Sequence, residues 1–316
     1  MAKITTIESV INEVHQQSAN HFDEIIPVHE MSFDSLNQMW ISGKQVDVAG
    51  SAQSLLANRL RVPHSYLMRC PQDLQARNLN YWIEQEKKNR DTFFCRFNGN
   101  SLRAVFTERY QPLDNMEILA QLIQLGFEPH LQVQYSLDHG MFLLKIPEYD
   151  KAFGVNAGGP LDEIIPGVAF ANSEVGLIAF SIESFFYRLI CTNGLISIAK
   201  ARESRFKHIS SRGLKNFAAT LAMVRDGSDR SRMKFKLSRE SHVHDPVRSI
   251  EAFCRRFGLS QNEAEIVKAV FEQEPGNTMF HIINAFTASA KMDGLSTADV
   301  YKFEKTGGQI LSLVKP

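Results

Sequence analysis

The fold class is decided by residues 131–146, which read LQVQYSLDHGMFLLKI. From Leu131 to Tyr135 apolar and polar residues alternate, and from Met141 to Ile146 the chain is almost wholly apolar. Alternation with a period of two is the pattern of a strand with one face against a core. Asp138-His139-Gly140, between the two halves, is typical of a turn. The stretch therefore predicts an antiparallel β-hairpin.

A second hairpin is predicted around Asn98-Gly99. Asn-Gly is favoured in two-residue turns because both turn positions need a positive φ. This turn would place Phe94 opposite Arg103 and Arg96 opposite Ser101. Arg96 and Arg103 would then share a face beside Phe94 that adds stacking to a nucleic-acid surface; the alternative is that the aromatic ring belongs to the core.

A third hairpin is predicted from residues 168–171 and 177–182, and helices are predicted on both sides of the three hairpins. The last helix, over residues 297–312, is expected to break at Gly307-Gly308. The fold class is therefore α+β, with a central antiparallel sheet of hairpins between an N-terminal and a C-terminal helical part. The expected division is a mainly helical part over 1–90, a β-rich core over 91–200, and a basic segment with C-terminal helices over 201–316.

Composition excludes several classes of protein. The chain has 316 residues, 44% of them hydrophobic, and Lys plus Arg equals Asp plus Glu at 35 each. No apolar run reaches the ~18 residues of a membrane span, and residues 1–10 lack the pattern of a signal peptide. The four cysteines are far apart, without the spacing of a zinc or disulfide scaffold. We expect a cytoplasmic protein without membrane contact.

The charge is unevenly distributed along this neutral chain. Residues 197–256 hold 15 basic and 6 acidic residues, which leaves a net charge of +9. Residues 81–196 hold 9 basic and 14 acidic residues, which leaves a net charge of −5. Neutrality therefore argues against uniform polyanion binding and still allows one local basic surface.

Two basic patterns lie in this segment, and each suits the phosphate backbone of a nucleic acid. Helical spacing would place one set on a single stripe: Arg202, Arg205, His208, Arg212 and Lys215. A strand over 232–237 would expose Arg232, Lys234 and Lys236 on one side. The alternative is a solvated face whose lysines protect a sheet edge from aggregation. Residues 51–70 also have the rhythm of a helix-turn-helix, with plain helical packing as the alternative.

Groups able to carry out chemistry are few. His242 and His244 have the spacing to present two imidazoles to a metal, and Glu174 with Glu183 offers carboxylates for Mg²⁺ or acid–base work. In both cases the alternative is an ordinary structural role. No phosphate-binding loop, nucleophile elbow or zinc-protease motif is present, and no cofactor is implied. The sequence favours a binding protein over an enzyme.

Four phrases, taken in order, carry a family resemblance: LRAV at 102–105, FANSEVG at 170–176, YRLICTNGLI at 187–196 and NAFT at 284–287. They resemble the phage- and plasmid-associated family with the domain of unknown function 932, over roughly residues 50–312. The resemblance implies a role in DNA metabolism or host interaction. It marks as candidates Asn172, Glu174, Gly176, Arg188, Asn193 and Gly194, with Arg188 expected to pair with Glu174 or Glu183.

The leading hypothesis is a protein that binds single-stranded DNA without acting on it, as an annealing or recombination accessory protein of a phage or plasmid. It is expected to form homo-oligomers. One alternative is a protein-interaction module that acts on host defence or plasmid regulation, with a host or phage protein as its partner. A second alternative is a metal-dependent nuclease that uses the carboxylates or histidines above.

Overall fold

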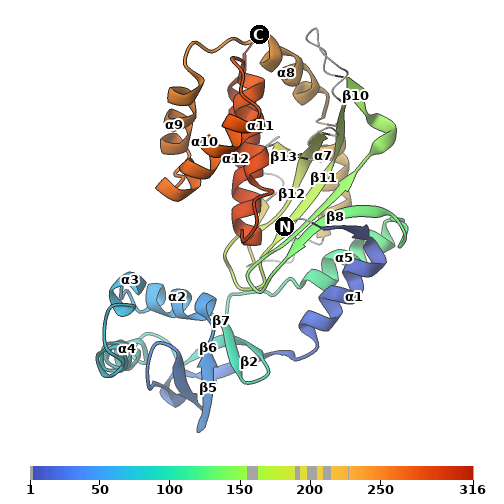
Figure 1. Cartoon of the computed structure of the whole chain (residues 1–316). Coiled ribbons are helices and arrows are strands. Elements are labelled where there is room, and N and C mark those ends of the chain that lie inside the picture. The colour runs from blue at the N-terminus through green and yellow to red at the C-terminus, as the bar shows by residue number, and fades with distance from the viewer. Residues whose placement is uncertain are drawn as a thin grey trace.

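Two β-sheets and the helices that cover them make up the fold in Figure 1. The structure is a computed structural model that describes residues 3–154, 163–188, 193–197, 205–208, 215–226 and 228–315. Sheet A has the strand order β1-β8-β9-β11-β12-β13, with β10 paired to β11 and β14 paired to β12. Sheet B has the order β2-β6-β7-β5-β4-β3. The predicted α+β class is confirmed.

Sheet B and three helices form the lower part of the molecule in Figure 1. Its elements are β2 (His21–Pro27), the 3-10 turn Val28–Glu30, β3 (Met31–Phe33), β4 (Gln38–Ile41), β5 (Lys44–Val48), α2 (Gly50–Arg59), α3 (His64–Leu67), α4 (Gln72–Glu86), β6 (Thr92–Asn98) and β7 (Ser101–Phe106). Helices α2–α4 cover one face of the sheet, and their apolar side chains share one core with those of the strands. The expected boundary at residue 90 falls between strands of this sheet, because β2 pairs with β6.

Sheet A and the remaining helices form the upper part of the molecule. The strands are β1 (Lys3–Thr6), β8 (Gln132–Leu137), β9 (Phe142–Pro147), β10 (Phe153–Gly154), β11 (Glu163–Asn172), β12 (Phe180–Arg188), β13 (Asn193–Ser197) and β14 (Arg205–Phe206). The helical elements are α1 (Ile7–Ser18), α5 (Asn115–Gln124), the 3-10 turn Tyr149–Lys151, α7 (Phe217–Asp226), α8 (Ser228–Glu240), α9 (Pro246–Arg256), α10 (Gln261–Gln273), α11 (Met279–Ser289) and α12 (Thr297–Leu313).

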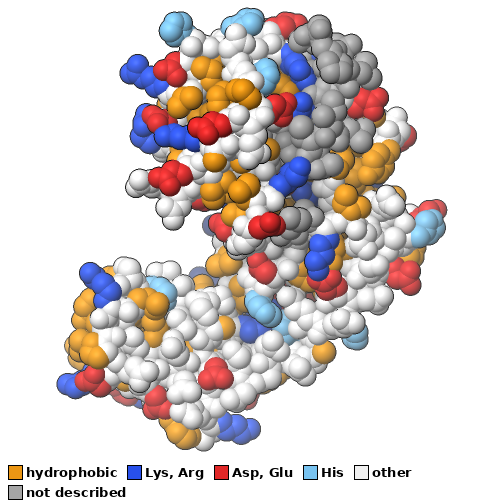
Figure 2. All heavy atoms as spheres, viewed as in Figure 1, with side chains coloured by type: hydrophobic (Ala, Val, Ile, Leu, Met, Phe, Trp, Pro, Cys, Tyr) orange, Lys and Arg blue, Asp and Glu red, His pale blue; other side chains and the backbone are white. Residues whose placement is uncertain are grey.

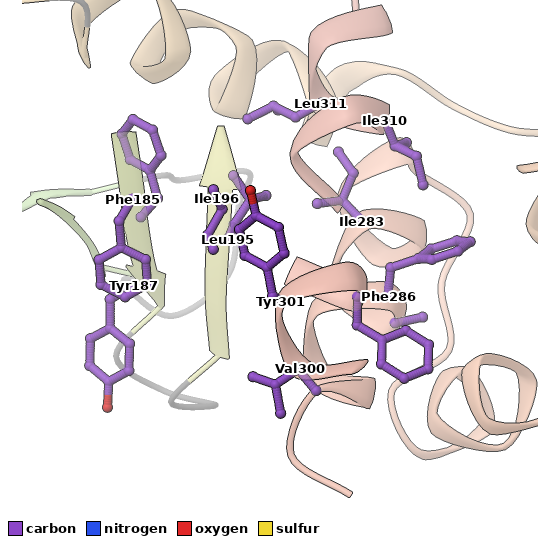
Figure 3. Close-up of a cluster of buried hydrophobic side chains, with 14 of the residues drawn as sticks. Phe185, Tyr187, Leu195, Ile196, Ile283, Phe286, Val300, Tyr301, Ile310 and Leu311 are labelled. Carbon is purple, nitrogen blue, oxygen red and sulfur yellow. The ribbon is translucent and has the colours of Figure 1, made fainter. Parts of the chain in front are cut away.

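Helices cover both faces of sheet A, which explains why β12 is buried along its whole length and β11 at every residue after Glu163. On β11, Val168 and Phe170 face a core shared with α1, α5 and α7. Ala169 and Ala171 face the opposite core, which is shared with α8–α12. Figure 3 shows the contact between β12, β13 and the helices α11 and α12 in this second core. Sheet A is therefore the middle layer of a three-layer arrangement.

The hairpins at 131–146 and 168–182 are confirmed. Strands β8 and β9 pair from Leu137 opposite Phe142, and Asp138 Oδ1 accepts hydrogen bonds from the backbone N–H groups of Gly140 and Met141. Strands β11 and β12 pair antiparallel across eight residues. The sequence pattern was sufficient here because strand pattern and turn chemistry agree.

The β6–β7 hairpin is present, but its predicted register was wrong. Asn98 pairs with Ser101, so the turn residues are Gly99 and Asn100, and Gly99 alone has a positive φ, at +54°. A bulge between Arg96 and Phe97 shifts the pairing further, so that Arg96 faces Ala104. Glycine at the first turn position suits a type II′ turn as well as Asn-Gly suits type I′, and the sequence does not separate them.

Residues 232–237 were predicted to be a basic strand, and they lie in helix α8 instead. Met, Lys, Leu and Arg are good helix formers, and the segment has no β-branched residue to favour a strand. At about 100° per residue, Arg232 and Lys236 share one helix face while Lys234 points away. The alternation of basic and apolar residues therefore did not indicate a strand.

The structure decides between the two interpretations of residues 51–70 in favour of plain helical packing, and one other prediction about helices was wrong. α3 has four residues, a single turn, which is too short for the recognition helix of a helix-turn-helix. α12 continues through Gly307-Gly308, where a Cβ on Gly307 would lie 2.4 Å from Cγ2 of Thr287 on α11. The glycine allows close packing of the two helices rather than breaking one.

Candidate functional site

The carboxylate of Glu174 lies at the junction of the two sheets. Glu174 is in the turn after β11, and its Oε2 accepts a hydrogen bond from Arg103 Nη2 of β7 at 2.9 Å. Its Oε1 accepts one at 2.9 Å from the backbone N–H of Asn115, the first residue of α5. Burial raises the pKa of Glu174, but the Asn115 N–H and the Arg103 guanidinium outweigh it, so the pKa lies below its usual range. Glu174 is therefore a fixed anion that holds the sheets together.

Arg96 makes a second connection at the same place. Its Nη1 donates to the backbone carbonyl of Glu174 at 3.1 Å, and its Nε donates to Asp23 at 2.9 Å. Its Nη2 pairs with Asp114, the N-cap of α5. Burial works against the charge of Arg96, yet the carboxylates of Asp114 and Asp23 leave its pKa raised. Arg96 and Arg103 are only 2% and 8% exposed, so the prediction that they form an exposed nucleic-acid face was wrong.

Two neutral histidines adjoin this ion-pair cluster. His21 Nδ1 lies 3.7 Å from Oε2 of Glu174, and the His208 ring stacks on Tyr110 with a centroid distance of 5.5 Å. Burial lowers the pKa of each histidine to about 4, and the charges of Arg103 near His21 and Arg96 near His208 add to the effect. Both imidazoles are therefore uncharged at neutral pH.

A cleft of about 560 Å³ lies beside Arg103, between the two parts of the molecule. Its lower wall is formed by Ala49, Gly50, Ser51 and Ser54 at the start of α2, with Asn98, Ser101 and Arg103 from the β6–β7 hairpin. The upper wall is formed by His139, Gly140 and Leu177 from two turns of sheet A. Figure 2 shows the surface hollowed between the two parts.

A second pocket, of about 300 Å³, lies against α12. It is lined by Met141, Ile178, Phe257, Ala298, Tyr301, Lys302, Lys305, Thr306 and Gln309. Gly140 and Leu177 line the cleft while their chain neighbours Met141 and Ile178 line this pocket. The two hollows are therefore neighbours, separated by the same two turns.

A buried cluster of polar groups adjoins the pocket. Glu183 of β12 accepts hydrogen bonds from Tyr301 at 2.8 Å and from Lys305 Nζ at 2.7 Å. Arg205 of β14 lies near this cluster, opposite Ser181 in the strand pairing. Burial lowers the pKa of Lys305, Glu183 opposes that shift, and the positive charge of Arg205 adds to it. Glu183 is thus the partner of Tyr301 and Lys305.

Of the predicted basic stripe over residues 202–215, residues 205–208 are not helical, whereas Lys215 is. Arg205 belongs to strand β14, and Phe206 beside it packs on Phe180. Arg205, Lys207 and Lys215 have exposed side chains, while His208 is buried. Arg202 and Arg212 lie outside the described residues. The aromatic residue at 206 fits an edge strand that pairs with β12, which the helical spacing of the basic residues did not reveal.

The basic residues of α8 serve mainly to dock that helix. Arg232 donates to the backbone carbonyl of Lys151 and covers the ring of Phe153 at 4.5 Å. Lys234 donates to the carbonyl of Ser312. Lys236 is exposed. α8 therefore does not present a single basic face.

Most residues of the family phrases have structural roles. Asn172 donates to the Leu113 carbonyl at 3.0 Å, and Gly176 has a φ of +80° against the ring of Phe106. The backbone of Asn193 pairs with Arg188 in the β12–β13 ladder. A Cβ on Gly194 would lie 2.5 Å from Oε1 of Glu304. Asn172 and Gly176 fix the turn after β11, and Gly194 fixes the contact between sheet A and α12.

Arg188 has a partner that the sequence analysis did not identify. Its guanidinium forms a bidentate pair with Glu274 at 2.9 and 3.0 Å and also donates to Asn284 at 2.8 Å. The expected pairing with Glu174 or Glu183 was wrong. Asn284 belongs to the late NAFT phrase, so two phrases 96 residues apart meet in one contact.

The two carboxylates considered for metal or acid–base chemistry do not come together. Glu174 and Glu183 occupy separate ion-pair clusters, and His242 bridges to Thr278 through its backbone. Within the described ranges, no three His, Cys, Asp or Glu side chains form a group able to hold a metal ion. In the same ranges, no helix is long and apolar enough to cross a membrane.

Sequence reasoning missed Lys207, Tyr301, Lys305 and the wall of the cleft at α2. Lys207 lies in the basic segment and alternates with Phe206, which was the available signal. Nothing in the sequence connects Lys305 of α12 with Glu183 of β12, because their contact spans 122 residues.

Comparisons with known proteins give one match. Neither the curated proteins nor the solved structures contain a match to this chain. A family model described as domain of unknown function (DUF932) matches residues 103–301. This range contains Arg103, Glu174, Arg188 and Asn284, and it ends at Tyr301 of the pocket. The chain therefore belongs to the DUF932 family.

Proposed function

We propose that this protein binds single-stranded nucleic acid, with the strand crossing Arg205 and Lys207 beside the cleft and the α12 pocket. The observation that supports the proposal most is the exposure of both cations on either side of Phe206, at the end of strand β14. Phe206 between them packs inward on Phe180, and the stack of His208 on Tyr110 holds the end of the segment. Cations at alternate residues suit a charged backbone.

The overall charge distribution supports the same proposal. Residues 197–256, with a net charge of +9, include the exposed cations Arg205, Lys207 and Lys215. The arginines of the β6–β7 hairpin, by contrast, are neutralised in buried ion pairs. Contacts to phosphate are independent of base sequence and depend on salt. We expect binding to many strand sequences, in the setting of DNA annealing or recombination on a phage or plasmid.

Fluorescence anisotropy with a labelled oligonucleotide tests the proposal. The full chain should bind single strands at low salt, and the double variant Arg205→Glu/Lys207→Glu should bind at least tenfold more weakly. Each lost phosphate contact should also lower the salt slope by about 0.7 for a single strand. Lys44→Glu/Lys88→Glu is the matched control, because both lysines are exposed and neither lines the cleft or the pocket.

Two results would contradict the proposal. The first is that the protein shows no binding to single strands at low salt, which would assign the basic surface to another partner such as an acidic protein. The other is an equal loss of affinity in the Arg205/Lys207 and Lys44/Lys88 variants, which would show only a general charge effect.

A further inference from the structure

We infer that the α12 pocket accepts one unpaired nucleobase of the bound strand, while Lys305, Lys302 and Arg205 face its phosphate. This inference rests on the proposed function and adds how the strand is held. It commits the site to a base that is not in a duplex, because a paired and stacked base cannot enter a pocket.

The pocket has an apolar wall suited to the flat face of a base. Met141, Ile178, Phe257 and Ala298 supply that wall, and Tyr301 adds an aromatic ring. The Tyr301 ring is fixed, since its hydroxyl donates to Glu183 and also contacts Lys305. Tyr301 is 6% exposed, so the part of it that reaches the pocket is rigid, and a rigid aromatic group contacts a base at little entropic cost. A volume of about 300 Å³ is of the size that holds a small planar ligand.

The other side of the pocket is polar and carries cations. Lys302 is 38% exposed at its side chain and pairs with Glu263 at 2.7 Å, and Lys305 pairs with Glu183 at 2.7 Å. Arg205 is a third cation near Lys305, since its charge acts on the pKa of that lysine. Apolar wall and cationic rim together match a base with its attached phosphate.

Gln309 offers a means of contacting the base edge. Gln309 lines the pocket, and its side-chain amide makes no hydrogen bond to the part of the chain that the structure describes. An amide can both donate and accept, so it can pair with the edge of any base. This adaptability agrees with binding that does not depend on sequence.

The position of the pocket relative to the cleft gives the strand a path. The turns that contain Gly140–Met141 and Leu177–Ile178 separate the two hollows. A strand lying in the cleft has only to cross these turns for its next base to reach the pocket. Leu177 is 50% exposed at this crossing, which suits contact with a base.

The test fills the pocket and follows a fluorescent base. Ala298→Phe places a ring in the pocket from a half-buried position on α12. Ala269→Phe, at an exposed position of α10, is the matched control. The probe is an oligothymidine with one 2-aminopurine, whose fluorescence falls when the base stacks. We expect the wild type and Ala269→Phe to quench the 2-aminopurine fluorescence. Ala298→Phe should not quench it and should bind the oligonucleotide about tenfold more weakly.

A second pair of variants does not depend on packing in the pocket. Lys302→Gln removes a rim cation from an ion pair, and Lys268→Gln removes the cation of a comparable ion pair with Glu251 away from the pocket. Of these two variants, only Lys302→Gln should bind the oligonucleotide more weakly. An abasic strand of equal length should also bind about tenfold more weakly than oligothymidine, with Ala298→Phe abolishing that difference.

The outcomes separate the two proposals. If no form of the protein binds any oligonucleotide, the proposed function fails. If all variants bind and quench equally, single-strand binding stands and the base pocket is wrong. Free thymidine monophosphate could also displace the labelled strand as effectively as the unlabelled oligonucleotide does. That result would show that the pocket binds a free nucleotide instead of a strand, and it would overturn the inference.

Discussion

The Nη2 atom of Arg103 lies 2.9 Å from Oε2 of Glu174, and this buried pair joins β7 of sheet B to the turn after β11 of sheet A. The same carboxylate accepts from the N-terminus of α5, which ties a third element to the junction. The pair also forms part of the wall beside the cleft, since Arg103 lines it. The geometry of the cleft therefore depends on the junction.

Removing the charge of Glu174 should destabilise the protein. In Glu174→Gln, the buried Arg103 guanidinium loses its counter-ion, and breaking a buried pair in this way costs about 3–5 kcal/mol. Urea unfolding measures the loss. Glu84→Gln is the matched control, since Glu84 pairs with Lys87 but is 62% exposed at its side chain, and a change below about 1 kcal/mol is expected there. Equal losses in both variants would show that the junction is not energetically special.

The free energy of unfolding should fall as the pH is lowered below about 6.5. His21 and His208 have a pKa of about 4 in the folded protein, against an ordinary value of 6.5. Between these values the unfolded chain binds protons that the folded chain does not, so acid favours unfolding, and the effect levels off below about pH 4.

Urea unfolding at about pH 7 and about pH 5 measures this dependence. His208→Phe keeps an aromatic ring beside Tyr110 and removes one titrating group, so it should reduce the difference between the two pH values. His130→Gln changes a histidine that is 78% exposed and should leave the difference unchanged. A wild-type stability that is the same at both pH values would show that the two imidazoles can be protonated in the folded state.

Gly176 should tolerate a methyl group less well than Gly126. Both residues have a positive φ, +80° and +86°, so alanine costs about 1 kcal/mol at either position from the backbone alone. A Cβ on Gly176 would also lie 2.7 Å from Cε1 of Phe106, whereas one on Gly126 would meet nothing within 4 Å. Gly176→Ala should therefore lower the free energy of unfolding clearly more than Gly126→Ala, and equal losses would contradict a packing role for Gly176.

The buried pair of Lys145 and Glu304 should behave non-additively. Their Nζ and Oε1 atoms are 2.6 Å apart, and the side chains are 1% and 3% exposed. Lys145→Met leaves an unpaired carboxylate in the core, at a cost of about 3–5 kcal/mol, while Lys145→Met/Glu304→Leu replaces both charges by apolar groups and should recover most of that stability. A double variant less stable than Lys145→Met would show that the pair contributes more than it costs to bury.

Much of the fold was predictable from local patterns. The hairpin at 131–146, the hairpin from β11 and β12, the Asp114 cap of α5 and the α+β class all follow from signals within about ten residues of one another. The strand register around Arg96 was not predictable from local patterns, because a bulge and the turn type change the pairing without a recognisable change in the sequence. The β14 strand at Arg205 also depends on the distant edge of β12.

Local residue patterns indicate that this chain folds as hairpins and helices with one strongly basic segment, and four phrases mark its family. Which cations are available depends on how the elements pack in three dimensions. Arg96 and Arg103 are neutralised by carboxylates brought from other elements, whereas Arg205 and Lys207 stay exposed on the surface. The physical reason is that strand and helix patterns arise from neighbouring residues, while burial and ion pairing join residues such as Arg103 and Glu174, 71 positions apart.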